Sequence, residues 1–315
     1  MLILITLLEI VVPVFLIIAA GYLTVRIGFI PDAAIDPLVK FQVAAGVPCL
    51  LFVSMLRTDL ATAINPWTLL AFFTSGTIVF LLAILLARRF WNRRPGEAVA
   101  VGFCAFFPNA VMLGIPITER AFGEPALAAV FGIIAFHSMY NWFVGFIAME
   151  AVRRDSESIA VGVARAFTTT FQNPLMVGLM LGILWNILSL PLPRVALDAI
   201  DMMAGAAIPV ALFALGGVLT RYRLLDKISE ASMVTVITLV VHPAIAWVLT
   251  DLVFGLPLPF VQACVVITAM PTGINSYIFA SLYNRAVGTA ASSVLLSTAV
   301  SVATITGWLA FLGSG

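Results

Sequence analysis

Charge is what this sequence has least of. Only 10% of its 315 residues are Asp, Glu, Lys or Arg, against 62% hydrophobic residues, whereas a soluble globular domain carries about 25% charged residues. A chain this poor in charge cannot cover itself with polar groups, so most of its surface must face a lipid bilayer. The formal net charge of +1 and the lack of any basic stripe exclude nucleic acid as a partner.

Cysteine and the motifs of common enzymes are also scarce. Cys49, Cys104 and Cys264 fall in apolar segments at unrelated spacings, so they predict neither a disulfide framework nor a zinc site. The patterns HExxH, GxSxG and the Walker loop are missing. We therefore predict no cofactor and no metal, and an intramembrane enzyme is the least favoured class of function.

The sequence is rich in hydrophobic runs of the length that crosses a membrane. A spanning helix needs roughly 20 apolar residues. The first run, Met1 to Tyr22, precedes the first basic residue, Arg26, which is the reverse of the order in a cleaved signal peptide. We expect ten spans, at residues 2–25, 38–56, 67–87, 97–118, 125–151, 172–190, 196–219, 231–253, 259–283 and 288–312.

The basic residues orient these spans. With the N-terminus outside, only Arg57, Arg120 and Arg194 of the 16 Lys and Arg residues fall in outer loops, and the other 13 face the cytoplasm. Lys and Arg are enriched in cytoplasmic loops, so we expect both termini outside. The expected location is the plasma membrane, which is the inner membrane of a bacterium, with multiple passes.

The two halves of the chain share a pattern of proline and glycine. Pro13 is followed eight residues later by Gly21, and Pro174 is followed eight residues later by Gly182. The two prolines are 161 residues apart in the sequence. The same offset relates PCLLF, which begins at Pro48, to PVALF, which begins at Pro209. A third pair, Pro108 and Pro271, has an offset of 163.

Each half holds five spans, an odd number, so the second half must enter the membrane from the opposite side. We therefore predict two inverted five-helix repeats, residues 1–151 and 172–315, joined by a cytoplasmic loop at 152–171. In chains with inverted repeats and an interrupted helix in each half, substrate binds near the midplane between the two breaks, and such chains are secondary transporters.

Helix breakers interrupt the fourth and the ninth expected span. FPNAVMLGIP (107–116) and MPTGINSYIF (270–279) each contain proline, which removes a backbone donor from a helix. Lipid cannot satisfy the backbone groups that such a break frees, so it survives only inside protein or beside a water-filled cavity. The two breaks are thus the expected place of the substrate.

At these breaks the sequence resembles the auxin efflux carriers, which include the PIN-type exporters of plants. FPNAVMLGIPITERAFGE (107–124) is similar to their LPNTLVMGIPL segment, and MPTGINSYIFASLYN (270–284) is similar to their second crossover, P-x-G-I-x-P-F-V-F-A-x-x-Y-N. The resemblance implies the ten-helix fold of the bile acid symporters and sodium–proton antiporters. In that fold helices 1, 2, 6 and 7 form a scaffold, and helices 3–5 and 8–10 form a transport domain with crossing helices 4 and 9.

The resemblance also implies a function. It implies transport of organic anions, namely auxin in plants and small carboxylates such as malonate or malate in bacterial relatives, often by homodimers joined through the scaffold. The short loop at 152–171 suits a bacterial member. Because Asn275 and Ser276 stand where plant sequences carry an apolar residue and proline, specificity for auxin is not carried over.

The breaks supply the first candidate substrate-binding residues. The N-terminus of a half-helix carries about half a positive charge, and its free N–H groups point at an anion, so a carboxylate can bind there without a buried Arg or Lys. The Asn109 amide can bind that carboxylate, cap a half-helix, or simply pack against another helix. The candidates at the breaks are Pro108, Asn109, Pro271, Thr272, Gly273 and Asn275.

A polar cluster in the fifth span supplies the others. His137, Tyr140 and Asn141 share one helical face, so we expect all three to face one cavity and to contact substrate. An ionisable residue inside a membrane indicates function, and His137 is a candidate proton relay because histidine titrates near neutrality. The alternative is a neutral His137 bonded to another helix.

The predicted function is a secondary carrier that moves small organic anions by alternating access. The middles of spans four and nine lack Asp and Glu, which argues against a cation antiporter, and the coupling ion, H⁺ or Na⁺, stays open. Gly178 and Gly182 form a GxxxG pair that we expect to pack span six on span one or to join two protomers. The alternatives are an anion channel and a ligand-sensing membrane protein.

Overall fold

The computed structural model describes residues 2–57, 65–152, 174–222 and 227–313. Within these ranges the chain is largely helical and contains no strand. The expected connecting loop at 152–171 lies, apart from its first residue, outside them. The helices of the first half, with 3-10 and π segments written η, are α1 (Leu2–Arg26), η1 (Asp32–Ala34), α2 (Ile35–Phe41), η2 (Gln42–Gly46), α3 (Val47–Arg57), α5 (Pro66–Phe90), α6 (Pro95–Phe106), η3 (Ala110–Gly114), α7 (Ile115–Phe122) and α8 (Glu124–Val152).

The second half follows the same order of long and interrupted helices. Its elements are α10 (Pro174–Ile187), α11 (Arg194–Leu219), α12 (Ile228–Val236), η4 (Ile237–Val241), α13 (His242–Trp247), η5 (Val248–Val253), α14 (Leu258–Thr268), α15 (Ile274–Leu282) and α16 (Val287–Phe311). In each half one helix is interrupted, between α6 and η3 and between α14 and α15.

Six described stretches are long and apolar enough to cross a membrane. They are Asp32–Arg57, Pro66–Trp91, Ala126–Val152, Arg194–Leu219, Ile228–Val253 and Val287–Phe311. Four shorter apolar helices lie at Val11–Arg26, Pro95–Phe106, Val177–Ile187 and Leu258–Thr268. The expected all-helical membrane architecture is confirmed over the described residues, while the count of ten spans stays a prediction.

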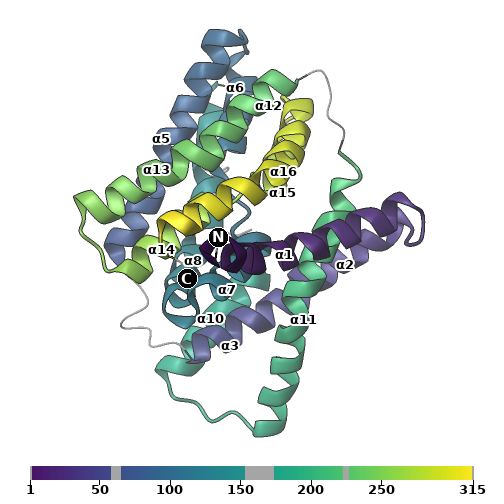
Figure 1. The fold of residues 1–315 in the computed structure, drawn as a ribbon, viewed down its shortest axis with the longest axis vertical. Helices are drawn as coiled ribbons and strands as arrows, with labels where there is room; N and C mark the ends of the chain where they lie inside the picture. Colours follow the sequence, from purple (N-terminus) through teal and green to yellow (C-terminus); the bar gives the residue numbers. More distant parts are fainter. Residues whose placement is uncertain (1, 58–64, 153–173, 223–226, 314–315) are drawn as a thin grey trace.

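The helices pack in two groups. In the first group α1 lies along α11, and α3 packs against both α10 and α11. In the second group α5 packs on α6, α12 on α16, and α8 on α14. Figure 1 shows the first group in the lower and right part of the view and α5, α6, α12 and α13 in the upper and left part.

Glycine allows close helix contact at two corresponding places in the first group. A Cβ atom on Gly21 of α1 would collide with the carbonyl oxygen of Phe213 in α11, and one on Gly182 of α10 would collide with that of Phe52 in α3. Gly21 and Gly182 are 161 residues apart, and so are Phe52 and Phe213. The offset found in the sequence is therefore repeated in the contacts between helices.

The other glycine of the GxxxG pair has the same neighbour helix. A Cβ atom on Gly178 would collide with the backbone of Pro48 in α3. Both glycines of the pair therefore pack α10 on α3, which is the second expected span, and not on α1 as the sequence led us to expect. The two small residues let the backbones approach closely.

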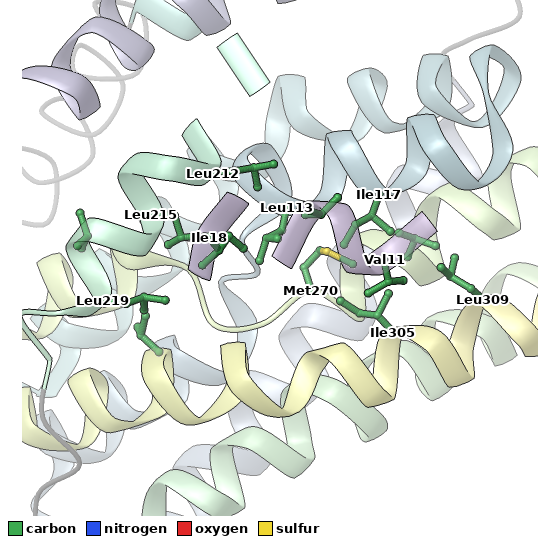
Figure 2. Packing of buried hydrophobic residues seen from close by; sticks show 14 of the residues in the cluster. Val11, Ile18, Leu113, Ile117, Leu212, Leu215, Leu219, Met270, Ile305 and Leu309 are labelled. Atoms are coloured by element: carbon green, nitrogen blue, oxygen red, sulfur yellow. The ribbon is translucent and has the colours of Figure 1, made fainter. Parts of the chain in front are cut away.

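A core cluster joins the first group to the helix breaks. Figure 2 shows its side chains pointing toward one another from α1, η3, α7, α11 and α16. Leu113 lies in η3 directly after the first break, and Met270 lies at the second break, and both are fully buried. The labelled members are Val11, Ile18, Leu113, Ile117, Leu212, Leu215, Leu219, Met270, Ile305 and Leu309.

A buried ion pair ties three elements of the second group together. Nε and Nη2 of Arg93, between α5 and α6, donate to the carboxylate of Glu230 in α12 at 2.9 and 2.6 Å. The hydroxyl of Thr289 in α16 donates to the same carboxylate at 2.6 Å. The Glu230 side chain is fully buried, and its hydrogen bond raises the pKa of the Arg93 guanidinium. The buried carboxylate is thus paired with a guanidinium and hydrogen-bonded by a hydroxyl.

Candidate functional site

The two helix breaks lie against each other at the centre of the site. Pro108 and Thr272 form an isolated antiparallel bridge. The backbone N–H of Asn109 donates to the carbonyl of Pro271 at 2.8 Å, and that of Gly273 donates to the carbonyl of Phe107, also at 2.8 Å. The two bonds are equivalent by a local two-fold rotation. This rotation places each residue of the first break on the residue of the second break that is 164 positions later in the chain.

Four side chains from other segments cap the end of α6 at this crossing. The last four carbonyls of a helix have no intrahelical partner, and inside a membrane they need one from elsewhere in the protein. The donors come from α15, the second break, η4 and α8. The bonds are Ser276 Oγ to Phe103 O at 3.4 Å, Thr272 Oγ1 to Cys104 O at 3.0 Å, Thr238 Oγ1 to Ala105 O at 3.3 Å and Asn141 Nδ2 to Phe106 O at 3.3 Å.

A cavity of about 460 Å³ lies beside the crossing. Its wall is formed by η2 and neighbouring residues of α2 and α3, by the first break, by residues 134–146 of α8, by α10, and by the second break with α15. Apolar side chains dominate the wall, and no described residue that lines it carries a formal charge. The sequence-predicted residues that line it are Pro108, Asn109, His137, Gly273 and Asn275.

The other four predicted site residues do not line the cavity. Pro271 accepts the hydrogen bond from Asn109, and Thr272 and Asn141 cap α6. The Tyr140 ring packs on Phe73 of α5, with ring centroids 4.3 Å apart, and its hydroxyl is 2.5 Å from that of Thr77. These contacts hold the crossing and the helices around it in place.

The two asparagines that face the cavity have unused side chains. The Asn109 residue is only 8% exposed, yet its carboxamide has no hydrogen-bond partner within the described part of the chain. Asn275 is half-buried in the first turn of α15, and its carboxamide likewise has no partner among the described residues. Each can therefore bond to a ligand without losing a contact inside the protein.

Two half-helix N-termini also open on the cavity. Val111 and Met112 lie in the first turn after the first break, and Ile274 and Asn275 lie in the first turn of α15, and all four line the wall. The first N–H groups of a helix lack intrahelical partners and carry partial positive charge. Their arrangement can attract an anion although the wall contains no cation.

His137 lines the cavity and lies near two aromatic rings. Its ring centroid is 5.4 Å from that of Phe107 and 6.5 Å from that of Phe72. Its Nδ1 atom is 3.5 Å from the Ile134 carbonyl and from the Ser138 hydroxyl, both in its own helix α8. The alternative prediction is a His137 side chain bonded to another helix, and within the described ranges no hydrogen bond of this kind is found.

Gln42 and Trp142 are two wall residues of functional interest that were not predicted from the sequence. Gln42 is 1% exposed and lines the cavity from η2, and Trp142 lines it from α8. The single polar residue in the apolar run FQVAAGVP was the signal for Gln42. Trp142 carries no such signal, because Trp is common at the membrane–water interfaces of spanning helices whether or not a ligand lies nearby.

Comparison with known proteins extends over nearly the whole chain. The sequence profile of a family described as "Membrane transport protein" matches residues 6–309. A protein named "Putative malonate transporter" from Rhizobium meliloti (strain 1021) is 29% identical over 310 residues, which cover 97% of this chain and 95% of that relative. An "Uncharacterized transporter" from Methanothermobacter thermautotrophicus is 24% identical over 303 residues, which cover 95% of this chain and 96% of that relative.

The family and these relatives are transporters, not enzymes, which agrees with the missing enzyme motifs. The matched profile covers far more than half of the chain and includes both helix breaks. This protein is therefore a membrane transporter that belongs to the membrane transport protein family, the family of the auxin efflux carriers.

Proposed function

We propose that this protein is a secondary carrier of small organic anions, such as malonate or malate, and that it binds them at the crossed helix breaks. One observation carries the proposal: two half-helix N-termini and the unpaired carboxamides of Asn109 and Asn275 face one uncharged cavity. The name of the relative from Rhizobium meliloti supports a carboxylate as substrate.

The chemistry of this site favours binding of moderate strength, which a transporter needs. Amide donors and helix dipoles attract a carboxylate but lack the full charge of a buried Arg or Lys. A carrier must release its substrate on the other side, so moderate affinity is an advantage. His137 in the cavity wall contacts the substrate or passes a proton during transport.

The contacts support an inverted repeat with alternating access. The two-fold exchange at Pro108 and Thr272, together with the matching positions of Gly21 and Gly182, is what two inverted five-helix units would produce. We assign residues 1–151 and 172–315 to these units. In this arrangement spans 1, 2, 6 and 7 form the scaffold, spans 3–5 and 8–10 form the transport domain, and both termini lie outside.

In the proposed topology the cavity lies toward the cytoplasmic side of the membrane. Val39, Phe146 and Leu282 line it, and all three lie near the ends of spans that the positive-inside rule assigns to the cytoplasm. Toward the other side, the buried side chains of Met55 and Ile133 belong to a packed core that joins α3 to α8. In the proposed mechanism this is the inward-facing arrangement, with the outer path closed.

The test is uptake and counterflow in proteoliposomes that contain the purified protein. We expect saturable flux of labelled malonate or malate, and indole-3-acetate tests the auxin-like alternative. The proposal fails if no carboxylate shows saturable flux, whereas flux that rises linearly with concentration would indicate an anion channel. The same assay under imposed pH and sodium gradients identifies the coupling ion, H⁺ or Na⁺.

Two further assignments belong to the proposal. We place the protein in the plasma membrane, the inner membrane of a bacterium, where lipid covers its apolar faces. We also propose a homodimer joined through the scaffold helices, which cross-linking in native membranes tests. If the protein still migrates as a monomer after treatment with the cross-linker at every concentration, the proposed dimer is wrong.

A further inference from the structure

Gln42 is a buried polar residue of the cavity to which the proposed mechanism gives no role. It begins the π-helical segment η2 in the second span, it is 1% exposed, and it lines the same cavity as Asn109 and Asn275. Its Oε1 atom has no hydrogen-bond partner among the described residues. An unsatisfied buried amide is costly, and π segments occur often at functional sites.

Within the described ranges, Gln42 is the residue that lines the cavity and also has an unpartnered side-chain atom that is itself fully buried, whereas the unpaired carboxamide of Asn109 is not buried in this way. The other described residues with a buried and unpartnered side-chain nitrogen or oxygen atom are Thr68, Trp185, His242 and Ser293. None of these four lines the cavity. The Gln42 oxygen is itself buried, and because the last side-chain torsion of glutamine has two broad, roughly equivalent orientations, the carboxamide can turn this oxygen toward a ligand in the cavity that the residue lines. The ligand is then its missing partner.

The position of Gln42 determines what kind of group it can meet. It lies on the wall formed by α2, η2 and α3, where its neighbours in the lining are Val39, Val43 and Leu51, and the anion-binding helix ends come from the breaks. A carboxamide oxygen accepts hydrogen bonds and repels a second carboxylate. A hydroxyl or an N–H group satisfies it.

We propose that Gln42 accepts a hydrogen bond from a hydroxyl or N–H group of the substrate. The carrier then selects carboxylates that also carry such a donor, for example 2-hydroxy acids, over otherwise equal carboxylates that lack it. This inference rests on the proposed function, because it takes the carboxylate site at the breaks as given. A site whose buried acceptor needs a donor discriminates against the analogue without one.

The test uses two ligands that differ by one hydroxyl group, malonate and hydroxymalonate, in competition with labelled substrate during counterflow. We expect the wild-type protein to bind hydroxymalonate about tenfold more tightly than malonate. Gln42→Met keeps the approximate shape of the side chain and removes its oxygen. In that variant we expect the two affinities to fall within about twofold of each other.

Gln262 offers a matched control. It is also buried, at 8% exposed, but its Nε2 donates to the Leu312 carbonyl at 3.4 Å, and it lies outside the cavity wall. Gln262→Met should keep the preference for hydroxymalonate. Thermal unfolding in detergent reports whether each variant folds. If Gln42→Met does not fold, Gln42→Asn replaces it: its side chain is shorter by one methylene group, so the amide no longer reaches the ligand, and the preference for hydroxymalonate should be lost.

Three outcomes separate the claims. Equal loss of affinity for both ligands in Gln42→Met would overturn the donor selection, and unchanged affinities would remove Gln42 from the site. Saturable wild-type flux without any preference for hydroxymalonate would defeat this inference alone. The absence of saturable wild-type flux for either ligand would defeat the proposed function instead.

Discussion

The backbone N–H of Asn109 donates to the carbonyl oxygen of Pro271 at 2.8 Å, so a bond between two residues that are 162 positions apart joins the two helix breaks. Because this bond uses the backbone of Asn109, it leaves the side-chain amide free to face the cavity. The crossing is thus held together without the group that we propose to bind substrate. Structure and binding can be separated at this residue by mutation.

Asn109→Ala should abolish saturable transport without unfolding the protein. The Asn109 carboxamide has no bond within the described chain, so its loss should change the free energy of unfolding by less than about 1 kcal/mol. Flux in proteoliposomes and the melting temperature in detergent measure the two effects. Transport at the wild-type level would remove Asn109 from the site.

Asn141→Ala should do the opposite. Its amide caps the Phe106 carbonyl at the end of α6, and hydrogen bonds between membrane helices contribute about 0.5–1.5 kcal/mol. We expect a lower melting temperature and a nearly unchanged affinity for substrate in the molecules that remain folded. Asn275→Ala serves as control, because its side chain faces the cavity and its loss should weaken binding without lowering the melting temperature.

Alanine at Gly21 or at Gly182 should destabilise the protein by similar amounts. Each new methyl group would collide with a carbonyl oxygen, that of Phe213 or that of Phe52, and overpacking of this kind costs about 1–3 kcal/mol. Gly205 is the matched control, since a Cβ atom there meets nothing within 4 Å. Gly205→Ala should be neutral or raise the melting temperature, because alanine favours the helix by about 1 kcal/mol.

Glu230→Gln should lower stability far more than the loss of an exposed ion pair. The substitution removes the carboxylate that Arg93 meets at 2.6 Å and leaves only the more distant Glu97 carboxylate, 3.7 Å from Nη1, and breaking such a buried pair costs about 3 kcal/mol. Asp201→Asn removes the partner of Arg57, an ion pair with much greater exposure of both side chains, and should cost less than about 1 kcal/mol. Equal melting temperatures for the two variants would show that the Glu230 pair contributes no more than a surface contact.

His137→Ala tests the proposed proton relay. If protons drive transport, the wild-type flux should respond to an imposed pH gradient, and the variant should keep a basal flux that no longer responds. A sodium gradient of equal size provides the control, because it leaves the protonation of histidine unchanged. A variant that still follows the pH gradient would rule His137 out as the relay.

Residue types alone predicted where the backbone of this protein is interrupted. Pro108 and Pro271 stand in long apolar runs, and proline removes a donor from its own backbone whatever surrounds it. The offset of 161 residues predicted which parts correspond, and the contacts of Gly21 and Gly182 repeat that offset. The same information could not say that Gly182 meets Phe52 of α3 rather than a residue of α1.

Tertiary structure decided which polar side chains face the cavity. His137 and Asn141 are one helical turn apart in α8, yet His137 lines the cavity and Asn141 caps the end of α6, while Gln42 enters the cavity from a different span. Composition, proline positions and helical period determined the all-helical membrane architecture and the two breaks. These properties of the sequence could be sufficient because each takes effect within a single segment of the chain. The partner of each polar group depends on which distant helices pack side by side, and only the folded arrangement of those helices decides it.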